Sequence, residues 1–440
     1  MKTFPILNKA ARRPRPGSAQ AGSILVMTII FCALIGLILM AYLSMVKAQH
    51  KFTYRAQTWN NCIPLCEAGL EEAMAHINHI NTTTNFAVNN WKLTGGYYRK
   101  ERTLNDGTIK MVIDQGVPPV ITVTGYLRAP IQSNQLIRAV RVKTRINYKF
   151  NYAMLGKGTI DISGGALIDS YNSTDPLKST GGQYDITKRT ADAIVATSSK
   201  ALGSVKIGNL DVYGKIAVGP GGTVDKVNGT VGDVTWVNNP ANDGKIQPGH
   251  FTDDVNLYIP DVQMPSPFAG LPPVGGIVGG VTYNAILPAG DWMLPSISGN
   301  DYKILVTGKA RLYVAGGTTI GNNGALTIAN GGSLEFFSNG NIDMKGAVNN
   351  PGLPKNLSFL GMPNCKMVGI NAGAQFACSI YAPQADVSIT GGGEGYGAVV
   401  ANTFKLSGGM RWHYDQGLQG DPLEGRYVAS SWQELDPPKN

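Results

Sequence analysis

The sequence predicts a mainly β protein. A long N-terminal helix, transmembrane and then amphipathic, is expected to pack on a small antiparallel sheet and to be followed by an irregular β-solenoid. Three observations predict this: an uncharged apolar run, a region of alternating apolar and polar residues, and short strands punctuated by Gly and Asn. The 440 residues include 55 Gly and 25 Pro but only 15% charged residues, as in proteins with many tight turns. We expect a basic leader at 1–22, a transmembrane helix at 23–46, a helix-and-sheet module at 47–152, a solenoid at 153–420 and a C-terminal tail at 421–440.

The apolar run Ile24–Val46 is long enough to cross a membrane. No charged residue lies between Arg15 and Lys47. At 1.5 Å per residue the run spans roughly 35 Å, against a hydrocarbon core of about 30 Å. A cleavable secretory signal has a shorter apolar region, of about 7 to 15 residues. The lipid bilayer is therefore an expected partner.

Basic residues flank this run. They account for much of the net charge of +9, whereas the C-terminal half has no excess of basic residues. The positive-inside rule places the N-terminus in the cytoplasm and the chain beyond Lys47 outside it. Nucleic acid is not an expected partner, because the basic cluster is explained by membrane orientation. The flanking residues are Lys2, Lys9, Arg12, Arg13 and Arg15 before the run, and Lys47, Lys51 and Arg55 after it.

The helix is expected to continue outside the membrane and to pack one face on a sheet. Pro64 removes one backbone hydrogen bond, which predicts a kink, and Glu67, Glu71 and Glu72 are expected to face water. The expected packing face has apolar residues at steps of three and four, the spacing of one helix face: Trp59, Ile63, Cys66, Leu70, Met74, Ile77 and Ile80.

Three alternating runs, at 108–113, 120–124 and 137–146, predict strands with one buried and one solvated face. The sequence Asn105-Asp106-Gly107 predicts a hairpin turn before the first of them. Together they form the expected antiparallel partner of the helix.

The later region predicts stacked short strands. Leu326, Leu334 and Ile342 recur every eight residues, each within a short strand followed by a Gly or Asn turn. We expect these residues to stack as rungs of a β-solenoid with Gly at the corners, and a β-sandwich is the alternative. Segments 158–165 and 210–219 fit the same pattern. The Pro-rich segment at about 260–288 is expected to be an extended loop, because proline lacks the amide hydrogen that a ladder needs.

The five cysteines predict no disulfide framework. Cys62 and Cys66 lie one helical turn apart without a second ligand pair, so we interpret them as small packing residues and expect no zinc. Cys365 and Cys378 form a plausible disulfide if their domain is extracytoplasmic.

Two stretches resemble known families. Ala21-Gly22-Ser23 and the stretch Cys66–Ala73 (CEAGLEEA) resemble type IV pilins and pseudopilins, most closely the PilX-like N-terminal group, over about residues 17–80. Segments within 379–415 resemble an uncharacterised β-helical domain found behind PilX-like anchors. The first resemblance implies a candidate leader cleavage between Gly22 and Ser23, and other pilin-like subunits as partners. Major pilins carry a glutamate where Met27 stands, so the resemblance implies a minor subunit.

The expected role is structural: a minor pilin-like or pseudopilin-like component of a type IV pilus or related assembly system, in a bacterial inner membrane. A surface adhesin that binds glycans and a polysaccharide-degrading enzyme are the alternatives. We name no catalytic residue, metal or cofactor. Acidic residues such as Asp161 and Asp169 are scattered singly, the motif His413-Tyr414-Asp415 lacks a nucleophile motif, and Gly391–Gly393 lacks the Lys of a phosphate loop, so it is expected to be a corner.

Overall fold

The computed structural model describes residues 20–78, 86–104, 107–130, 135–162, 164, 167–257, 259–349, 352–371, 375–420 and 422–436. The chain divides into two compact units. The first comprises residues 1–145 and 427–440, and the second comprises residues 146–426. This division lies close to the boundary expected after residue 152. The predicted turn at Asn105-Asp106 lies outside the described residues.

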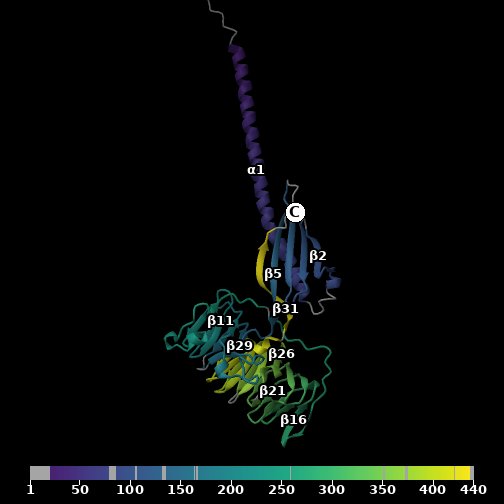
Figure 1. Cartoon of the computed structure of the whole chain (residues 1–440), viewed down its shortest axis with the longest axis vertical. Helices are drawn as coiled ribbons and strands as arrows, with labels where there is room; N and C mark the ends of the chain where they lie inside the picture. The colour runs from purple at the N-terminus through teal and green to yellow at the C-terminus, as the bar shows by residue number, and fades with distance from the viewer. Residues whose placement is uncertain are drawn as a thin grey trace, which may run out of the picture. The chain divides into compact units, whose positions relative to one another are not determined.

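The first unit contains one long helix, α1 (Gln20–Ile77) (Figure 1). The helix is continuous through Pro64, so it does not end at the position of the expected kink. Its N-terminal part is apolar on all sides and exposed, whereas its C-terminal part packs on strands β3 (Gly107–Asp114) and β4 (Val120–Arg128). The predicted helix-on-sheet arrangement is confirmed.

The sheet of the first unit is antiparallel. Residues in β3 alternate between buried and partly exposed, as the sequence predicts for a sheet with one covered face. The long strand β5 carries the predicted run at 137–146. The order along the sheet is β1 (Lys92–Thr94), β2 (Tyr97–Leu104), β3, β4, β5 (Gln135–Tyr148) and β31 (Pro422–Leu435).

The expected C-terminal tail at 421–440 is wrong for most of its length. Residues 422–435 form β31, which is hydrogen-bonded beside β5 at the edge of the sheet. The Ser430 hydroxyl donates to the carbonyl of Lys143, and Glu434 pairs with Arg138, so the two strands run in opposite directions. β31 has no strong turn signal of its own, and its partner lies almost 300 residues earlier in the sequence.

The second unit consists mainly of short parallel strands that stack in long ladders. It also contains the short α-helix α3 (Val234–Val237). A first ladder runs through β17 (Gly290–Leu294), β20 (Lys309–Val314), β23 (Ser333–Ser338), β26 (Leu357–Gly361), β28 (Phe376–Thr390), β29 (Glu394–Ser407), β6 (Met154–Gly156), β9 (Ala193–Thr197), β11 (Asp211–Ala217) and β14 (Phe251–Thr252).

A second ladder shares β28 and β29 with the first, because these long strands bend from one ladder into the other. It runs through β18 (Ile297–Gly299), β21 (Thr318–Ile320), β24 (Ile342–Met344), β27 (Met367–Asn371), β28, β29, β7 (Ile160–Ile162), β10 (Val205–Ile207) and β12 (Val224–Val227).

A third run of parallel pairs completes the large sheet. It joins β29 to β30 (Arg411–Asp415), β8 (Leu167–Tyr171), β11 and β13 (Val231–Gly232).

A separate sheet in the same unit has five strands. It contains β15 (Val274–Val278), β16 (Val281–Leu287), β19 (Lys303–Val306), β22 (Ala325–Ile328) and β25 (Ala347–Val348).

Six of these strands close a ring. β29 pairs with β6, β6 with β9, β9 with β11, β11 with β8, β8 with β30, and β30 again with β29, all in parallel. The structure therefore contains a six-stranded parallel barrel in place of the predicted irregular solenoid.

The predicted stacking of residues eight positions apart is also wrong. Leu334 does not stack on Leu326 or Ile342; its ladder neighbours are Ala310 and Leu357, which lie 24 and 23 residues away. The eight-residue spacing separates three consecutive strands, which belong to the separate sheet, the first ladder and the second ladder. Strands do form at the predicted positions, as β22, β23 and β24.

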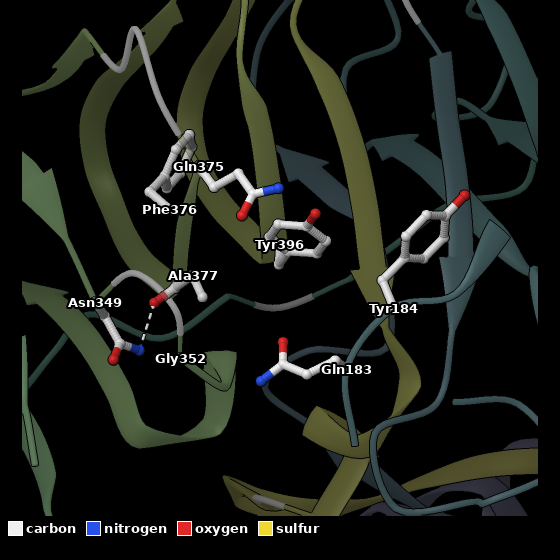
Figure 2. Close-up of a pocket in the computed structure, with 8 residues that line it drawn as sticks. All are labelled: Gln183, Tyr184, Asn349, Gly352, Gln375, Phe376, Ala377 and Tyr396. Atoms are coloured by element: carbon white, nitrogen blue, oxygen red, sulfur yellow. Dashed lines mark hydrogen bonds between the residues drawn. The ribbon is translucent and has the colours of Figure 1, made fainter. Parts of the chain in front are cut away.

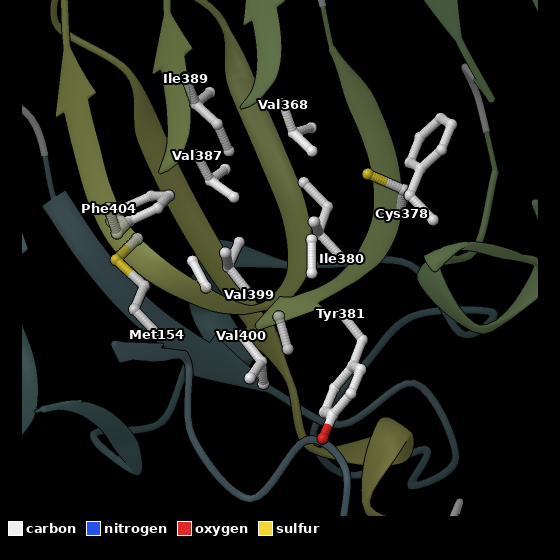
Figure 3. Close-up of a cluster of buried hydrophobic side chains, with 14 of the residues drawn as sticks. Met154, Val368, Cys378, Ile380, Tyr381, Val387, Ile389, Val399, Val400 and Phe404 are labelled. Carbon is white, nitrogen blue, oxygen red and sulfur yellow. The ribbon is translucent and has the colours of Figure 1, made fainter. Parts of the chain in front are cut away.

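The core of the second unit joins segments that are distant in sequence. Met154 is the ladder partner of Val399, and Ile160 is the partner of Phe404. Figure 3 shows Met154, Val399 and Phe404 among the buried side chains. The first strands of this unit thus pack on its last strands, which holds the unit together as one body.

The Pro-rich segment at about 260–288 is not wholly a loop. β15 and β16 form an antiparallel hairpin within it, joined by Gly279 and Gly280, which both have positive φ. The prolines lie before and after the two strands, so they remove no ladder hydrogen bond.

Candidate functional site

The N-terminal half of α1 is the most unusual surface of the chain. Its large apolar side chains from Ile24 to Met45 are between 48% and 70% exposed. The most apolar 18-residue window of α1 has a mean hydropathy of 3.0, none of it is buried, and the helix is long and apolar enough to cross a membrane. We name residues 24–46 the apolar stem. An exposed apolar surface of this size requires a partner outside the chain.

The candidate cleavage residues Gly22 and Ser23 lie in the first turn of α1. They directly precede the apolar stem. Cleavage there stays a prediction.

The C-terminal half of α1 docks through a line of small residues, not through the predicted stripe. Only Cys66 and Ile77 of that stripe are fully buried, Trp59 is 38% exposed, and Ile80 lies outside the described residues. Small side chains allow the helix backbone to approach the sheet closely. The buried line is Thr58, Cys62, Cys66, Gly69, Ala73 and Ile77.

Cys62 and Cys66 are packing residues, as predicted. The Sγ atoms of Cys62 and Cys66 lie 3.9 Å and 3.5 Å from the carbonyl oxygens of Leu136 and Arg138. Burial raises the pKa of both thiols, that of Cys66 to about 11, so they stay protonated at neutral pH. A protonated, buried thiol is a poor nucleophile and a poor metal ligand.

Glu72 does not face water as predicted. Its carboxylate lies 2.6 Å from Lys100 Nζ and 2.8 Å from the Arg102 guanidinium, both on β2. Burial raises the pKa of Glu72, but the hydrogen bonds and charges of the two basic residues outweigh this, and the net pKa is lowered. Glu67 and Glu71 are exposed, as predicted.

Arg138 connects three elements of the first unit. Its guanidinium donates to both carboxylate oxygens of Glu434, at 2.6 and 2.8 Å, and to the carbonyl of Trp59 at 3.2 Å. It also lies over the Trp59 ring, 4.8 Å from its centroid. The residue therefore links α1, β5 and β31.

The expected disulfide between Cys365 and Cys378 is wrong, because both are free thiols. Burial raises the pKa of Cys365 to about 11.

In the second unit, His413 is part of a buried polar cluster. The His413 Nδ1 atom lies 2.6 Å from Asp169 Oδ1, and the Tyr184 hydroxyl donates to Asp169 Oδ2 at 2.6 Å. The rings of Tyr184 and Tyr396 stack on the imidazole, with centroids 3.8 Å and 5.0 Å away. Burial and the adjacent carboxylate raise the pKa of Tyr184, so the phenol keeps its proton and donates.

The described residues place no Ser, Thr or Cys nucleophile in this cluster. His413 Nε2 is buried without a hydrogen-bond partner among the described residues, and no Ser, Thr or Cys bonds to it there. Asp169 and His413 are direct partners in the ladder between β8 and β30. The Asp–His pair therefore tethers two strands.

The residues of the motif His413-Tyr414-Asp415 make separate contacts. His413 bonds to a side chain and not to backbone. Asp415 does bond to backbone: its Oδ1 accepts from the amides of Ser173 and Gly417 at 2.9 and 2.8 Å. Tyr414 and Trp412 are both buried.

A pocket of about 180 Å³ opens beside this cluster (Figure 2). Tyr184 and Tyr396 belong to both. The loop between β8 and β9, the loop after β25 and the starts of β28 and β29 contribute to it. It is lined by Gln183, Tyr184, Asn349, Gly352, Gln375, Phe376, Ala377 and Tyr396.

Sequence reasoning missed this pocket. Its residues come from four separate segments, and none of them forms a motif. Asn349, with φ of +47°, is one of two positive-φ residues other than glycine among the described residues, and a φ value cannot be read from sequence. The glycines at 391–393, predicted to form a corner, lie between β28 and β29.

No group of three or more His, Cys, Asp or Glu side chains within the described part of the chain has the geometry to hold a metal ion. Asp169 is buried in the His413 cluster, while Asp185 caps a short 3-10 helix at Ile186–Lys188 by accepting from the Thr187 amide. These carboxylates have separate structural roles.

Comparison with known proteins gives two likenesses. A family model described as a domain of unknown function (DUF7305) matches residues 296–421, less than half of the chain. No curated protein matches the sequence of this chain. Among solved structures, the crystal structure of the competence-associated pilin ComZ from Thermus thermophilus is similar at 14% identity, over 86% of this chain and 97% of that one. Its TM-score is 0.23, which supports no inference about this chain.

Proposed function

We propose that this protein is a membrane-anchored structural subunit, a minor pilin-like or pseudopilin-like component of a type IV pilus or related assembly system. The apolar stem is the single observation that carries the proposal. It is continuous with a helix half that docks on an antiparallel sheet. A helix that is apolar and exposed in its first half and docked in its second supports a pilin-like anchor.

Lipid and other apolar helices are the proposed partners of the stem. All-round apolarity suits lipid, because lipid contacts every side of a helix. The same surface suits packing among the stems of neighbouring subunits in a filament. The basic leader favours a cytoplasmic N-terminus, with both compact units outside the inner membrane.

Membrane fractionation combined with protease protection tests this proposal. The full chain should sediment with the inner membrane, and protease added to spheroplasts should digest both units. Recovery of the intact chain from the cytosol, or protection of both units in spheroplasts, would contradict the proposal.

Cross-linking tests the subunit role. A photoreactive residue in place of Leu37, in the apolar stem, should cross-link to stems of other pilin-like subunits. The matched position is Leu202, which is 81% exposed on the second unit and should yield no such product. Cross-links to lipid alone would support the anchor and argue against the filament.

We also propose that the second unit is not an enzyme. Glycoside hydrolysis requires two carboxylates that face each other across a groove. In this unit Asp169 and Asp415 are buried and held by Tyr184, His413 and backbone amides. Release of reducing ends from pectin-like or alginate-like polymers by the purified protein would disprove this.

A further inference from the structure

The pocket beside Tyr184 and Tyr396 is not explained by anchoring or assembly. Its walls are held in place before any ligand arrives. The Tyr396 hydroxyl donates to Glu394 at 2.6 Å, and Asn349 Nδ2 donates to the carbonyls of Leu353 and Ala377 at 3.1 and 2.9 Å. Rigid walls lower the entropy cost of binding.

Two glutamines supply uncommitted polar atoms. Gln183 is exposed, and its side chain makes no hydrogen bond with any residue that the structure describes. Gln375 uses its amide nitrogen to bind Glu394 at 3.0 Å, which leaves its Oε1 free to accept. Figure 2 shows the Gln375 amide beside the ring of Tyr396 and the Gln183 amide below it among the lining residues. An amide offers a donor and an acceptor together, which suits a ligand rich in hydroxyl groups.

The lining carries no charge. None of its eight residues is ionisable at neutral pH. Glu394, which holds both Tyr396 and Gln375, is itself paired with Arg411 at 3.0 Å, so it adds no net charge. A carboxylate or phosphate ligand would lose its hydration without gaining a counter-ion. The ligand should therefore be neutral.

The size of the pocket limits the ligand further. Pockets for drug-sized molecules have volumes of about 300–1,000 Å³, and this pocket has about 180 Å³. Two partly exposed aromatic side chains, Tyr184 and Tyr396, give it apolar surface as well as amides. A ring with an apolar face and hydroxyl groups at its edge fits both features.

We propose that this pocket binds one neutral pyranose residue of a glycan, with Tyr396 against the apolar face of the ring and the amides of Gln183 and Gln375 bonded to its hydroxyl groups. The site does not depend on the anchoring role. An anchored subunit without sugar affinity and a sugar-binding protein without filament partners are distinguishable results.

Titration of the full-length protein in lipid nanodiscs tests the site. The ligands are glucose, galactose, mannose and N-acetylglucosamine, with glucuronate and galacturonate as charged counterparts. At least one neutral sugar should bind with a dissociation constant of about 1 mM, a weak affinity suited to one ring. Gln183→Ala should weaken it about tenfold, because it removes hydrogen bonds at the ligand.

Two further variants make the result specific. Tyr396→Ala removes the ring that contacts the sugar and should weaken binding about tenfold, whereas Gln135→Ala changes an exposed glutamine on the first unit and should bind unchanged. Binding of none of the neutral sugars, a preference for the uronates, or unaltered binding by Gln183→Ala would each overturn the assignment.

Discussion

The two halves of α1 are equally helical but bury their surfaces differently. In the apolar stem, apolar residues cover every side and none is buried. In the second half, the buried residues form one line, Thr58 to Ile77, and charged residues such as Glu67 and Glu71 remain exposed. A helix that is apolar on all sides requires apolar surroundings on all sides, whereas an amphipathic helix buries its apolar face against a single sheet. The distribution of apolar residues around a helix thus separates a lipid contact from a protein contact.

Charges in the stem should have the largest effect. Leu34→Lys with Ile38→Lys places two cations near the middle of the stem, at a cost of about 3 kcal/mol each for insertion. We expect the protein to be lost from the membrane fraction, as measured by carbonate extraction and fractionation. Glu67→Lys with Glu71→Lys, on the exposed side of the second half, is the matched control and should fractionate normally. Insertion of the stem variant would refute the lipid contact.

Substitutions at two glycines, one in each half of α1, allow the two halves to be compared directly. A Cβ atom on Gly69 would lie 2.6 Å from Ile109 Cγ2 and 2.8 Å from Val123 Cγ1, whereas a Cβ atom on Gly36 would have no neighbour within 4 Å. Gly69→Ala should therefore destabilise the first unit by about 1–3 kcal/mol through overpacking.

Hydrogen exchange of β3 and β4 amides would measure this loss. Gly36→Ala should leave exchange of the sheet unchanged, since it only improves helix propensity, by about 1 kcal/mol. Equal effects of the two substitutions would mean that the close helix–sheet contact at Gly69 does not exist.

The Glu72 ion pairs should give helix docking a pH dependence. The pKa of Glu72 is lower in the folded protein than its ordinary value of 4.5. Its contribution is therefore complete above about pH 4.5 and is lost as the pH falls through the folded-state pKa. Glu72→Gln should cost about 1–2 kcal/mol at pH 7, and denaturation of the variant should respond less to acid than that of the original protein. An identical acid response of the variant and the original protein would exclude Glu72 as a source of the pH dependence.

The link from α1 to the C-terminal strand should have the smallest effect. The Glu434 side chain is 37% exposed, so solvent screens its pair with Arg138. Glu434→Gln should cost no more than about 1 kcal/mol. Faster hydrogen exchange should be confined to β31 and the adjoining part of β5. Exchange that is unchanged in β31 would show that backbone pairing alone holds this strand.

Local sequence was sufficient for the elements whose signal is local. The stem follows from residues 24–46 because hydropathy is a property of each residue and its near neighbours. The strands around 107–146 follow from period-two alternation, since successive side chains of a strand point to opposite faces. The predicted packing face of α1 is displaced by about one residue from the buried line. The prediction followed the large apolar side chains, whereas small residues such as Gly69 and Ala73 are the ones that contact the sheet.

What the tertiary structure decided is the pairing of distant segments. β31 joins β5, β6 stacks on β29, Cys365 and Cys378 remain apart, and Gln183 meets Tyr396 at one pocket. Hydrophobic spacing marks where a strand lies, but its partner depends on the competing fits of all other strands. Local residue patterns therefore suffice for the apolar stem and the strand positions, whereas the parallel barrel and the pocket depend on contacts between distant segments of the folded chain.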